Sequence, residues 1–160
     1  MSIVHPIPPV FDERSEILIL GSFPSVKSRE TGFYYGHRQN RFWKTLAAVY
    51  GEKVPETTEE KRSFLLSRRL ALWDVIGECE IKGSSDASIR SVKPNDLALV
   101  TGNSPVKKVV LNGSKAFALY EKYHKDLDLP YFKAPSTSPA NAAYSLSRMA
   151  EEWGKLLKNQ

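Results

Sequence analysis

The sequence predicts one α/β domain, with helices and a central four-stranded parallel sheet arranged as a three-layer α/β/α fold. Apolar segments of strand length alternate with segments of helical apolar spacing along the chain. This alternation is typical of parallel sheets with right-handed crossovers and helices on both faces. The chain has 160 residues and carries no internal repeat, low-complexity tract or linker. We therefore expect residues 1–160 to form a single domain.

The first half of the chain predicts a buried strand followed by two helices. Residues 17–20 form the continuous apolar run Ile-Leu-Ile-Leu, typical of a parallel strand that is covered on both faces. Residues 40–50 repeat apolar side chains at helical spacing and stop at a glycine, a common residue at helix ends. Residues 56–69 are charged and amphipathic, and Thr57 or Thr58 is the expected cap of that helix.

The second half predicts three more strands. Their apolar residues lie at 70–76, 106–111 and 129–133. Between the first two of these strands we expect a polar loop over residues 78–91 and a short helix opened by Pro94. The remaining predicted elements are a helix over residues 115–125, capped by Ser114, and a closing helix over residues 142–158.

Composition narrows the possible functions. The net charge of +5 and the pI near 9.3 favour a polyanionic partner. No apolar run is long enough to cross a membrane and the N-terminus lacks a signal-peptide pattern, so we expect a cytoplasmic protein. The single cysteine, Cys79, excludes an internal disulfide and a four-cysteine iron–sulfur cluster. The three histidines form no zinc pattern, and we expect neither a metal nor another cofactor.

The loop after the first strand is the most informative part of the chain. Residues 21–25 read GSFPS, a turn that brings the backbone close to a ligand, and residues 31–43 read TGFYYGHRQNRFW. Ligands of α/β folds bind beyond the carboxyl ends of strands. We therefore expect the functional site in this strand–loop–helix unit.

Two segments resemble the active-site motifs of the uracil-DNA glycosylase superfamily. The stretch at 31–43 is similar to the first motif of the mismatch-specific uracil-DNA glycosylases, and residues 136–142, STSPANA, stand where the superfamily keeps its second motif. The pairing of GSFPS with STSPANA is most similar to the hypoxanthine-DNA (deoxyinosine) glycosylase branch. The resemblance implies the three-layer fold of that superfamily, which the strand pattern alone does not distinguish from other doubly wound folds.

The resemblance also implies an activity. It predicts a monofunctional DNA glycosylase of base excision repair that flips a deaminated base out of the helix and hydrolyses the N-glycosidic bond with water. Hypoxanthine is the expected first substrate, with uracil or xanthine next. The implied partner is DNA that contains deaminated bases, and the implied enzyme is a monomer that acts on the bacterial or archaeal nucleoid.

Asn40 is the predicted catalytic residue. Many superfamily members place an acidic residue or an asparagine two residues beyond the motif glycine, but this chain has Phe23 there, which cannot orient water. The hypoxanthine branch, which this chain resembles, uses an asparagine further along the motif. The matching residue here is Asn40. Its side-chain carbonyl can accept a hydrogen bond from water and aim it. An equally weighted alternative is that Asn40 caps the following helix, and the two roles are compatible.

Five residues are candidates for binding the base. Tyr35 matches the position of an aromatic that stacks on the flipped base in the mismatch-specific enzymes. Asp74 ends a strand where uracil-specific relatives carry asparagine, and its carboxylate can accept from a ring N–H; capping the next turn is its alternative role. Backbone groups of Ser22 and Phe23 are further candidates. His37 is able to donate to the departing base, although a loop histidine is more often simply solvated.

Hydroxyl-bearing loops are the candidates for holding the DNA. Serines in tight loops suit phosphate contacts that position without specifying sequence, and the second motif would press into the minor groove. The alternative is an ordinary loop with a helix cap. The predicted DNA-backbone and minor-groove residues are Ser25, Ser28, Ser136, Thr137, Ser138, Pro139, Ala140 and Asn141.

Two other functions remain open at this stage. A catalytically weak or inactive nucleic-acid-binding protein of the same fold is one, because Phe23 replaces an acidic residue and Ser136 stands where several relatives carry histidine. A small doubly wound esterase or phosphatase is the other. Against it, GSFPS lacks the Gly-x-Ser-x-Gly nucleophile elbow.

Overall fold

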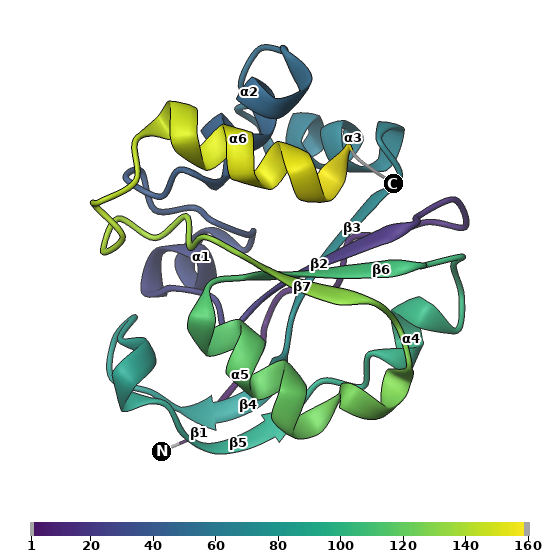
Figure 1. Ribbon diagram of the computed structural model, residues 1–160. Coiled ribbons are helices and arrows are strands. Elements are labelled where there is room, and N and C mark those ends of the chain that lie inside the picture. The colour runs from purple at the N-terminus through teal and green to yellow at the C-terminus, as the bar shows by residue number, and fades with distance from the viewer. Residues whose placement is uncertain (1, 159–160) are drawn as a thin grey trace.

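A four-stranded parallel sheet forms the centre of the protein, as Figure 1 shows for the computed structural model, which describes residues 2–158. The strands are β2 (Ile17–Gly21), β3 (Leu70–Asp74), β6 (Lys108–Asn112) and β7 (Tyr131–Ala134). Their order is β3-β2-β6-β7, and every neighbouring pair is parallel. The predicted α/β class and four-stranded parallel sheet are confirmed.

Helices cover both faces of this sheet. In Figure 1, α2 (Phe42–Tyr50), α3 (Thr58–Ser67) and α6 (Leu146–Leu157) lie on one side, and α4 (Ala98–Thr101) and α5 (Ser114–Tyr123) lie on the other. All residues of β2 and β3 are buried, which explains why both strands are continuous apolar runs. The aromatic rings of Phe42 and Trp153 join α2 to α6 with centroids 5.9 Å apart.

Some predicted helix ends are confirmed and others are wrong. Thr57 accepts from the N–H of Glu60 in a capping box, as predicted for α3. Ser114 is the first residue of α5 and makes no cap bond, because Gly113 precedes the helix in a conformation with φ +95°. The closing helix begins at Leu146, after the cap Ser145, and not at residue 142.

The predicted polar loop over residues 78–91 is wrong at both ends. A second, antiparallel sheet of order β1-β4-β5 contains β1 (Ser2–Val4), β4 (Ile76–Glu80) and β5 (Arg90–Pro94). Pro94 therefore ends a strand and does not open a helix. These strands escape prediction because β4 pairs with the distant N-terminus and its side chains are only partly buried.

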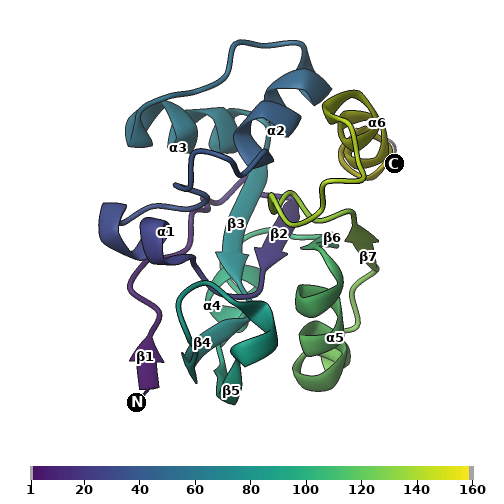
Figure 2. The ribbon, with the colours of Figure 1, turned by 90° about the vertical axis from the view of Figure 1, so that its left-hand side faces the viewer.

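The second sheet brings the N-terminal segment to the carboxyl end of β3. Figure 2 shows β1 beside β4 below the ends of β2 and β3. The strand β4 follows β3 after the single residue Val75, so its N-terminal neighbour β1 is also close to that end. A short helix, α1 (Val26–Thr31), lies in the loop after β2. No helix within residues 2–158 is long and apolar enough to cross a membrane.

Candidate active site

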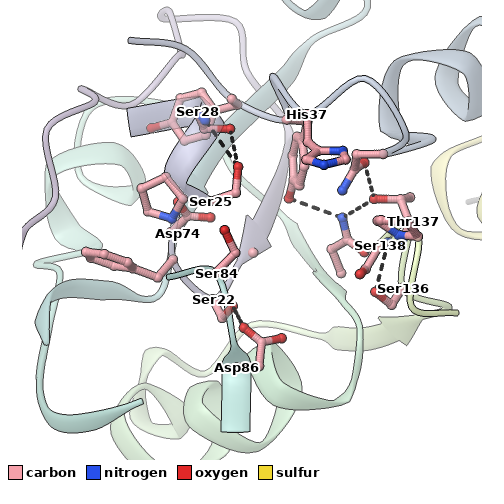
Figure 3. Close-up of a pocket in the computed structure, with 18 residues that line it drawn as sticks. Ser22, Ser25, Ser28, His37, Asp74, Ser84, Asp86, Ser136, Thr137 and Ser138 are labelled. Atoms are coloured by element: carbon pink, nitrogen blue, oxygen red, sulfur yellow. Dashed lines mark hydrogen bonds between the residues drawn. The ribbon is translucent and has the colours of Figure 1, made fainter. Parts of the chain in front are cut away.

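A cavity of about 290 Å³ opens at the carboxyl ends of the central strands, where Figure 3 shows its lining side chains. Three segments form it: the loop after β2, the loop between β4 and β5, and the loop after β7. The volume is at the small end of the range for ligand pockets, about 300–1,000 Å³. The two predicted motifs thus face each other across one cavity, together with a third loop that the sequence did not indicate.

A chain of hydrogen bonds connects the two motifs through the end of β6. The Thr137 hydroxyl donates to Asn40 Oδ1 at 2.9 Å and accepts from Asn112 Nδ2 at 3.0 Å. Asn112 Nδ2 also donates to the Tyr35 hydroxyl at 3.1 Å, and Asn112 Oδ1 accepts from the Thr137 N–H at 3.0 Å. This network fixes the orientation of three predicted site residues, and Asn112 is a member that sequence reasoning missed.

The carbonyl oxygen of Asn40 is fully occupied by the protein. Besides Thr137, it accepts from the N–H of Phe42, the first residue of α2, at 2.9 Å. The N-cap position of α2 is Arg41, which makes no side-chain cap bond, so Asn40 bonds the first N–H of the helix from one residue further out. We had expected this carbonyl to aim a water, and both of its bonds are to the protein instead. The side-chain amino group remains, and among residues 2–158 no acceptor is bonded to it. Asn40 thus offers the cavity a donor.

Asp74, Gly21 and Tyr35 meet at the floor of the cavity. A Cβ atom on Gly21 would lie 2.6 Å from Asp74 Oδ1 and 2.7 Å from the Tyr35 hydroxyl. Only glycine fits there, because real Cβ atoms do not approach other atoms so closely. The glycine of the first motif is therefore required by a close approach of side chains. Its own backbone stays in the extended strand β2.

The carboxylate of Asp74 is buried and bonded to a histidine. Asp74 is 2% exposed, and its Oδ2 accepts from His5 Nε2 at 2.8 Å. No backbone N–H of the described residues donates to this carboxylate, so the alternative role of Asp74 as a turn cap is wrong. Sequence reasoning missed His5, because 69 residues separate it from Asp74 and no local pattern connects them.

Tyr35 has only one ring face available for a base. Its other face stacks on Phe42, with ring centroids 4.1 Å apart. Burial raises the pKa of Tyr35, and the nearby Asp74 carboxylate raises it further, so the hydroxyl keeps its proton. The backbone of Tyr35 has φ +54°, an uncommon left-handed conformation for this residue type that the aromatic packing holds in place.

The backbone at the start of the first motif offers donors to a ligand. Neither the N–H of Ser22 nor that of Phe23 is bonded to an acceptor in residues 2–158. Phe23 is buried and forms a wall of the cavity, with the edge of His5 against its ring at 5.7 Å. Ser22 and Phe23 both line the cavity, and their role in binding a base stays a prediction.

The loop between β4 and β5 is attached to the first motif by three hydrogen bonds. Ser22 Oγ donates to Asp86 Oδ1 at 3.0 Å, the N–H of Val26 donates to Ser84 Oγ at 2.9 Å, and Arg29 donates to the Gly83 carbonyl at 2.6 Å. Asp86 is exposed at the cavity rim, yet the surrounding protein desolvates its carboxyl group and raises its pKa. Ser84 and Asp86 thus complete the cavity wall beside Ser22, as Figure 3 shows.

Two of the residues predicted to contact DNA have buried side chains. Thr137 is fully buried in the network described above. Ser28 is 1% exposed, and its hydroxyl accepts from the N–H of Gly36 at 2.9 Å. Ser25 caps α1 by accepting from the N–H of Ser28. In this structure the hydroxyls of Ser25, Ser28 and Thr137 are bonded within the protein and shape the two loops.

The remaining predicted residues lie around the mouth of the cavity. His37 is exposed at the rim, and Ser136, Ser138 and Pro139 line the opposite side. Ala140 is exposed at the tip of the same loop.

Arg41 fastens the loop that carries the second motif. It donates to the carbonyl groups of Tyr144 and Asn141 at 2.5 and 2.8 Å. Within the loop, Asn141 Nδ2 donates to the Ser136 carbonyl at 3.0 Å. The loop is therefore preorganised and presents its exposed tip outward.

Residues 2–158 contain no group of three or more His, Cys, Asp or Glu side chains that could hold a metal ion. The cavity lining offers one buried carboxylate, one rim carboxylate, the imidazole of His37, amides, hydroxyls and aromatic rings.

Comparisons with known proteins agree with this architecture. Two proteins named hypoxanthine DNA glycosylase are similar to the chain. The one from Methanosarcina barkeri is 33% identical over 94% of this chain and 96% of its own length, and the one from Methanosarcina acetivorans is 35% identical over 90% and 92%. A solution NMR structure of a Methanosarcina acetivorans protein, proposed to be a uracil DNA glycosylase, superposes with a TM-score of 0.84 at 33% identity and covers 99% of this chain and 98% of its own. Residues 8–157 match the uracil DNA glycosylase superfamily as a whole, and the chain belongs to that superfamily.

Proposed function

We propose that this protein is a monofunctional DNA glycosylase that excises hypoxanthine from DNA, acting as a monomer in base excision repair. Membership of the superfamily, and the names of its relatives, make it a hydrolase of N-glycosyl bonds in DNA. The names of the relatives support hypoxanthine as the base. The observation that carries the wider class, bases with a ring N–H beside a carbonyl, is the pairing of a buried acceptor, Asp74 Oδ1, with the unbonded N–H groups of Ser22 and Phe23.

This pairing complements the edge that deamination creates. Hypoxanthine presents a ring N–H beside a carbonyl oxygen, and so do uracil and xanthine. The Asp74 carboxylate accepts from the ring N–H, and a backbone N–H donates to the carbonyl oxygen. The ring of Tyr35 stacks on the flipped base with its uncovered face, a contact of about 1–3 kcal/mol per base.

Asn40 positions the attacking water through its amino group. The network through Thr137 and the bond from Phe42 hold its amide in one orientation, so the donor faces the cavity. An amide is no general base, and the rate therefore rests on positioning and on stabilising the departing base. A lysine Schiff base is not part of this mechanism, because no lysine among residues 2–158 lines the cavity.

The mouth of the cavity contacts the DNA. Ser136, Ser138 and Ser25 contribute hydroxyls that can contact phosphates, and the exposed tip at Pro139 and Ala140 presses into the minor groove at the gap left by the flipped nucleotide. The net charge of +5 supports binding to a polyanion.

Alkali cleavage of labelled oligonucleotides that carry one hypoxanthine, uracil or xanthine tests the proposal. Abasic-site formation should be fastest with hypoxanthine and should leave the strand uncut before alkali treatment. Asn40→Ala should retain binding to inosine-containing DNA and lose at least about 100-fold in the single-turnover rate. A wild-type protein that binds DNA but releases none of these bases would instead be a binding protein of the same fold.

A further inference from the structure

The side chain of His5 is buried against the base-reading carboxylate although it belongs to the N-terminal segment. It is 2% exposed, and its Nε2 lies 2.8 Å from Asp74 Oδ2. The segment is held by the bond from the His5 N–H to the Gly77 carbonyl at 2.8 Å. On the other side of His5 in the sequence, the Tyr34 hydroxyl donates to the Pro8 carbonyl at 2.9 Å and so also holds the N-terminal segment. These two hydrogen bonds hold the backbone before and after the imidazole, which therefore has a defined position.

The backbone also determines which imidazole nitrogen carries the proton. The N–H of Ile7 donates to His5 Nδ1 at 3.2 Å, so Nδ1 is an acceptor. The proton of the neutral ring is then on Nε2, which donates to Asp74 Oδ2. A donor directed at one oxygen favours the ionised carboxylate and fixes its plane. Asp74 Oδ1 is left pointing toward Gly21 and the cavity floor.

No other described group competes for Asp74 Oδ1. Besides burial, the Asp74 charge raises the pKa of three neighbouring groups, Tyr34, Tyr35 and Asp86. Burial raises the pKa of both tyrosines, so they remain neutral. Asp86 is a second carboxyl group and offers no positive charge. His5 is therefore the one side chain within residues 2–158 that donates a hydrogen bond to the Asp74 carboxylate.

We propose that His5 is a specificity-determining positioning residue: it holds Asp74 as a hydrogen-bond acceptor, so that the pocket takes bases with a ring N–H beside a carbonyl and rejects adenine. This inference rests on the proposed function. Adenine presents an acceptor where hypoxanthine presents the ring N–H, and a donor where hypoxanthine presents the carbonyl. Both partners would be mismatched at once. A site built on such hydrogen bonds can reject an analogue by about 10⁴–10⁵-fold.

The test compares two substitutions of His5, one that keeps an N–H donor and one that lacks it. His5→Gln keeps an N–H donor at similar reach, and His5→Leu keeps similar volume without the donor. Val4→Ala, at the exposed last residue of β1 and next to His5, controls for disturbance of the N-terminal segment. Single-turnover excision of hypoxanthine is measured between pH 5.5 and 9, and thermal unfolding is measured alongside.

Removal of the donor should make the rate depend on pH. A buried carboxylate without a partner takes up a proton at higher pH, and the protonated form presents its O–H to the ring N–H of the base. The hypoxanthine rate of His5→Leu should therefore be at least about 10-fold lower at pH 6.5 than at pH 8.5, rising about tenfold per pH unit for one proton. Wild type, His5→Gln and Val4→Ala should show no such rise. The same rise in His5→Gln, or its absence in a folded His5→Leu, would overturn the proposal.

A second measurement keeps the proposal testable if His5→Leu does not fold. In Asp74→Asn, the His5 donor should hold the amide oxygen and turn the amino group into the cavity, which reverses the hydrogen-bonding sense of the pocket. Excision of hypoxanthine should then be lost, and discrimination against adenine in binding should fall by at least about 10-fold. If Asp74→Asn discriminates against adenine as strongly as wild type does, the proposed positioning of Asp74 by His5 is wrong. Inactivity of the wild type toward every lesion would instead reject the proposed function.

Discussion

Replacing Gly21 by alanine should disrupt the cavity floor while leaving the sheet intact. The new Cβ would lie 2.6 Å from Asp74 Oδ1 and 2.7 Å from the Tyr35 hydroxyl. An ordinary carbon–oxygen contact of about 3.3 Å requires each oxygen to move by about 0.6–0.7 Å. Misplacement by about 1 Å in an active site can reduce the rate about 100-fold. We therefore expect Gly21→Ala to lose about 10- to 100-fold in single-turnover excision of hypoxanthine.

The effect of this substitution on stability should be smaller and measurable separately. Overpacking in a core typically lowers the free energy of unfolding by about 1–3 kcal/mol. In a domain of this size, each kcal/mol lowers Tm by about 2–4 °C. The expected fall in Tm is therefore about 2–12 °C, and the protein stays folded at assay temperature. Gly154→Ala in α6 is the matched control, because its nearest neighbour lies at 3.9 Å and alanine favours a helix. If Gly21→Ala loses stability but keeps the wild-type rate, the geometry of Asp74 and Tyr35 does not determine catalysis.

Three further substitutions address separate parts of the structure. Thr137→Val removes the donor to Asn40 Oδ1 while keeping the shape of the side chain, so the excision rate should fall about 10-fold or more with DNA affinity unchanged, as gel-shift and single-turnover assays would show. Desolvation raises the pKa of Asp86 in the folded protein above its value in the unfolded chain. The protonated Asp86 therefore contributes most to stability in acid, and this contribution is lost as pH rises through the folded-state pKa. Between pH 4 and pH 7, Tm should fall less in Asp86→Asn than in wild type. Thr57→Ala removes the capping box of α3 and should cost about 0.5–2 kcal/mol in urea unfolding with no change in excision, since it lies outside the cavity.

The parts of the fold that local sequence determines were predictable. A continuous apolar run gives β2, and the capping box gives the start of α3. The two motifs also indicated which loops meet, because the carboxyl ends of parallel strands lie at one edge of a sheet. Asn40, Tyr35 and Asp74 accordingly line one cavity.

The parts that depend on pairing between distant segments were not predictable. The strand β4 has the sequence Ile-Gly-Glu-Cys-Glu, which reads as a polar turn until β1 pairs with it. His5 and Asn112 are ordinary polar residues in sequence, and only the tertiary fold brings them to Asp74 and Thr137. The orientation of the Asn40 amide follows from two hydrogen bonds, one of them to a residue 97 positions away.

The arrangement of donors and acceptors explains how the cavity can work without an acidic residue at Phe23 or a histidine at Ser136. A carboxylate that accepts from the ring N–H of the base adds electron density to a leaving group that is already becoming negative, and this opposes bond cleavage. Donors on the other atoms of the base must offset that effect. The unbonded N–H groups of Ser22 and Phe23 are such donors, while the amino group of Asn40 positions the water in the proposed mechanism. In the proposed mechanism, selectivity thus comes from Asp74 and rate from the N–H donors, so Asp74→Asn should raise excision of a base that lacks the ring N–H relative to hypoxanthine.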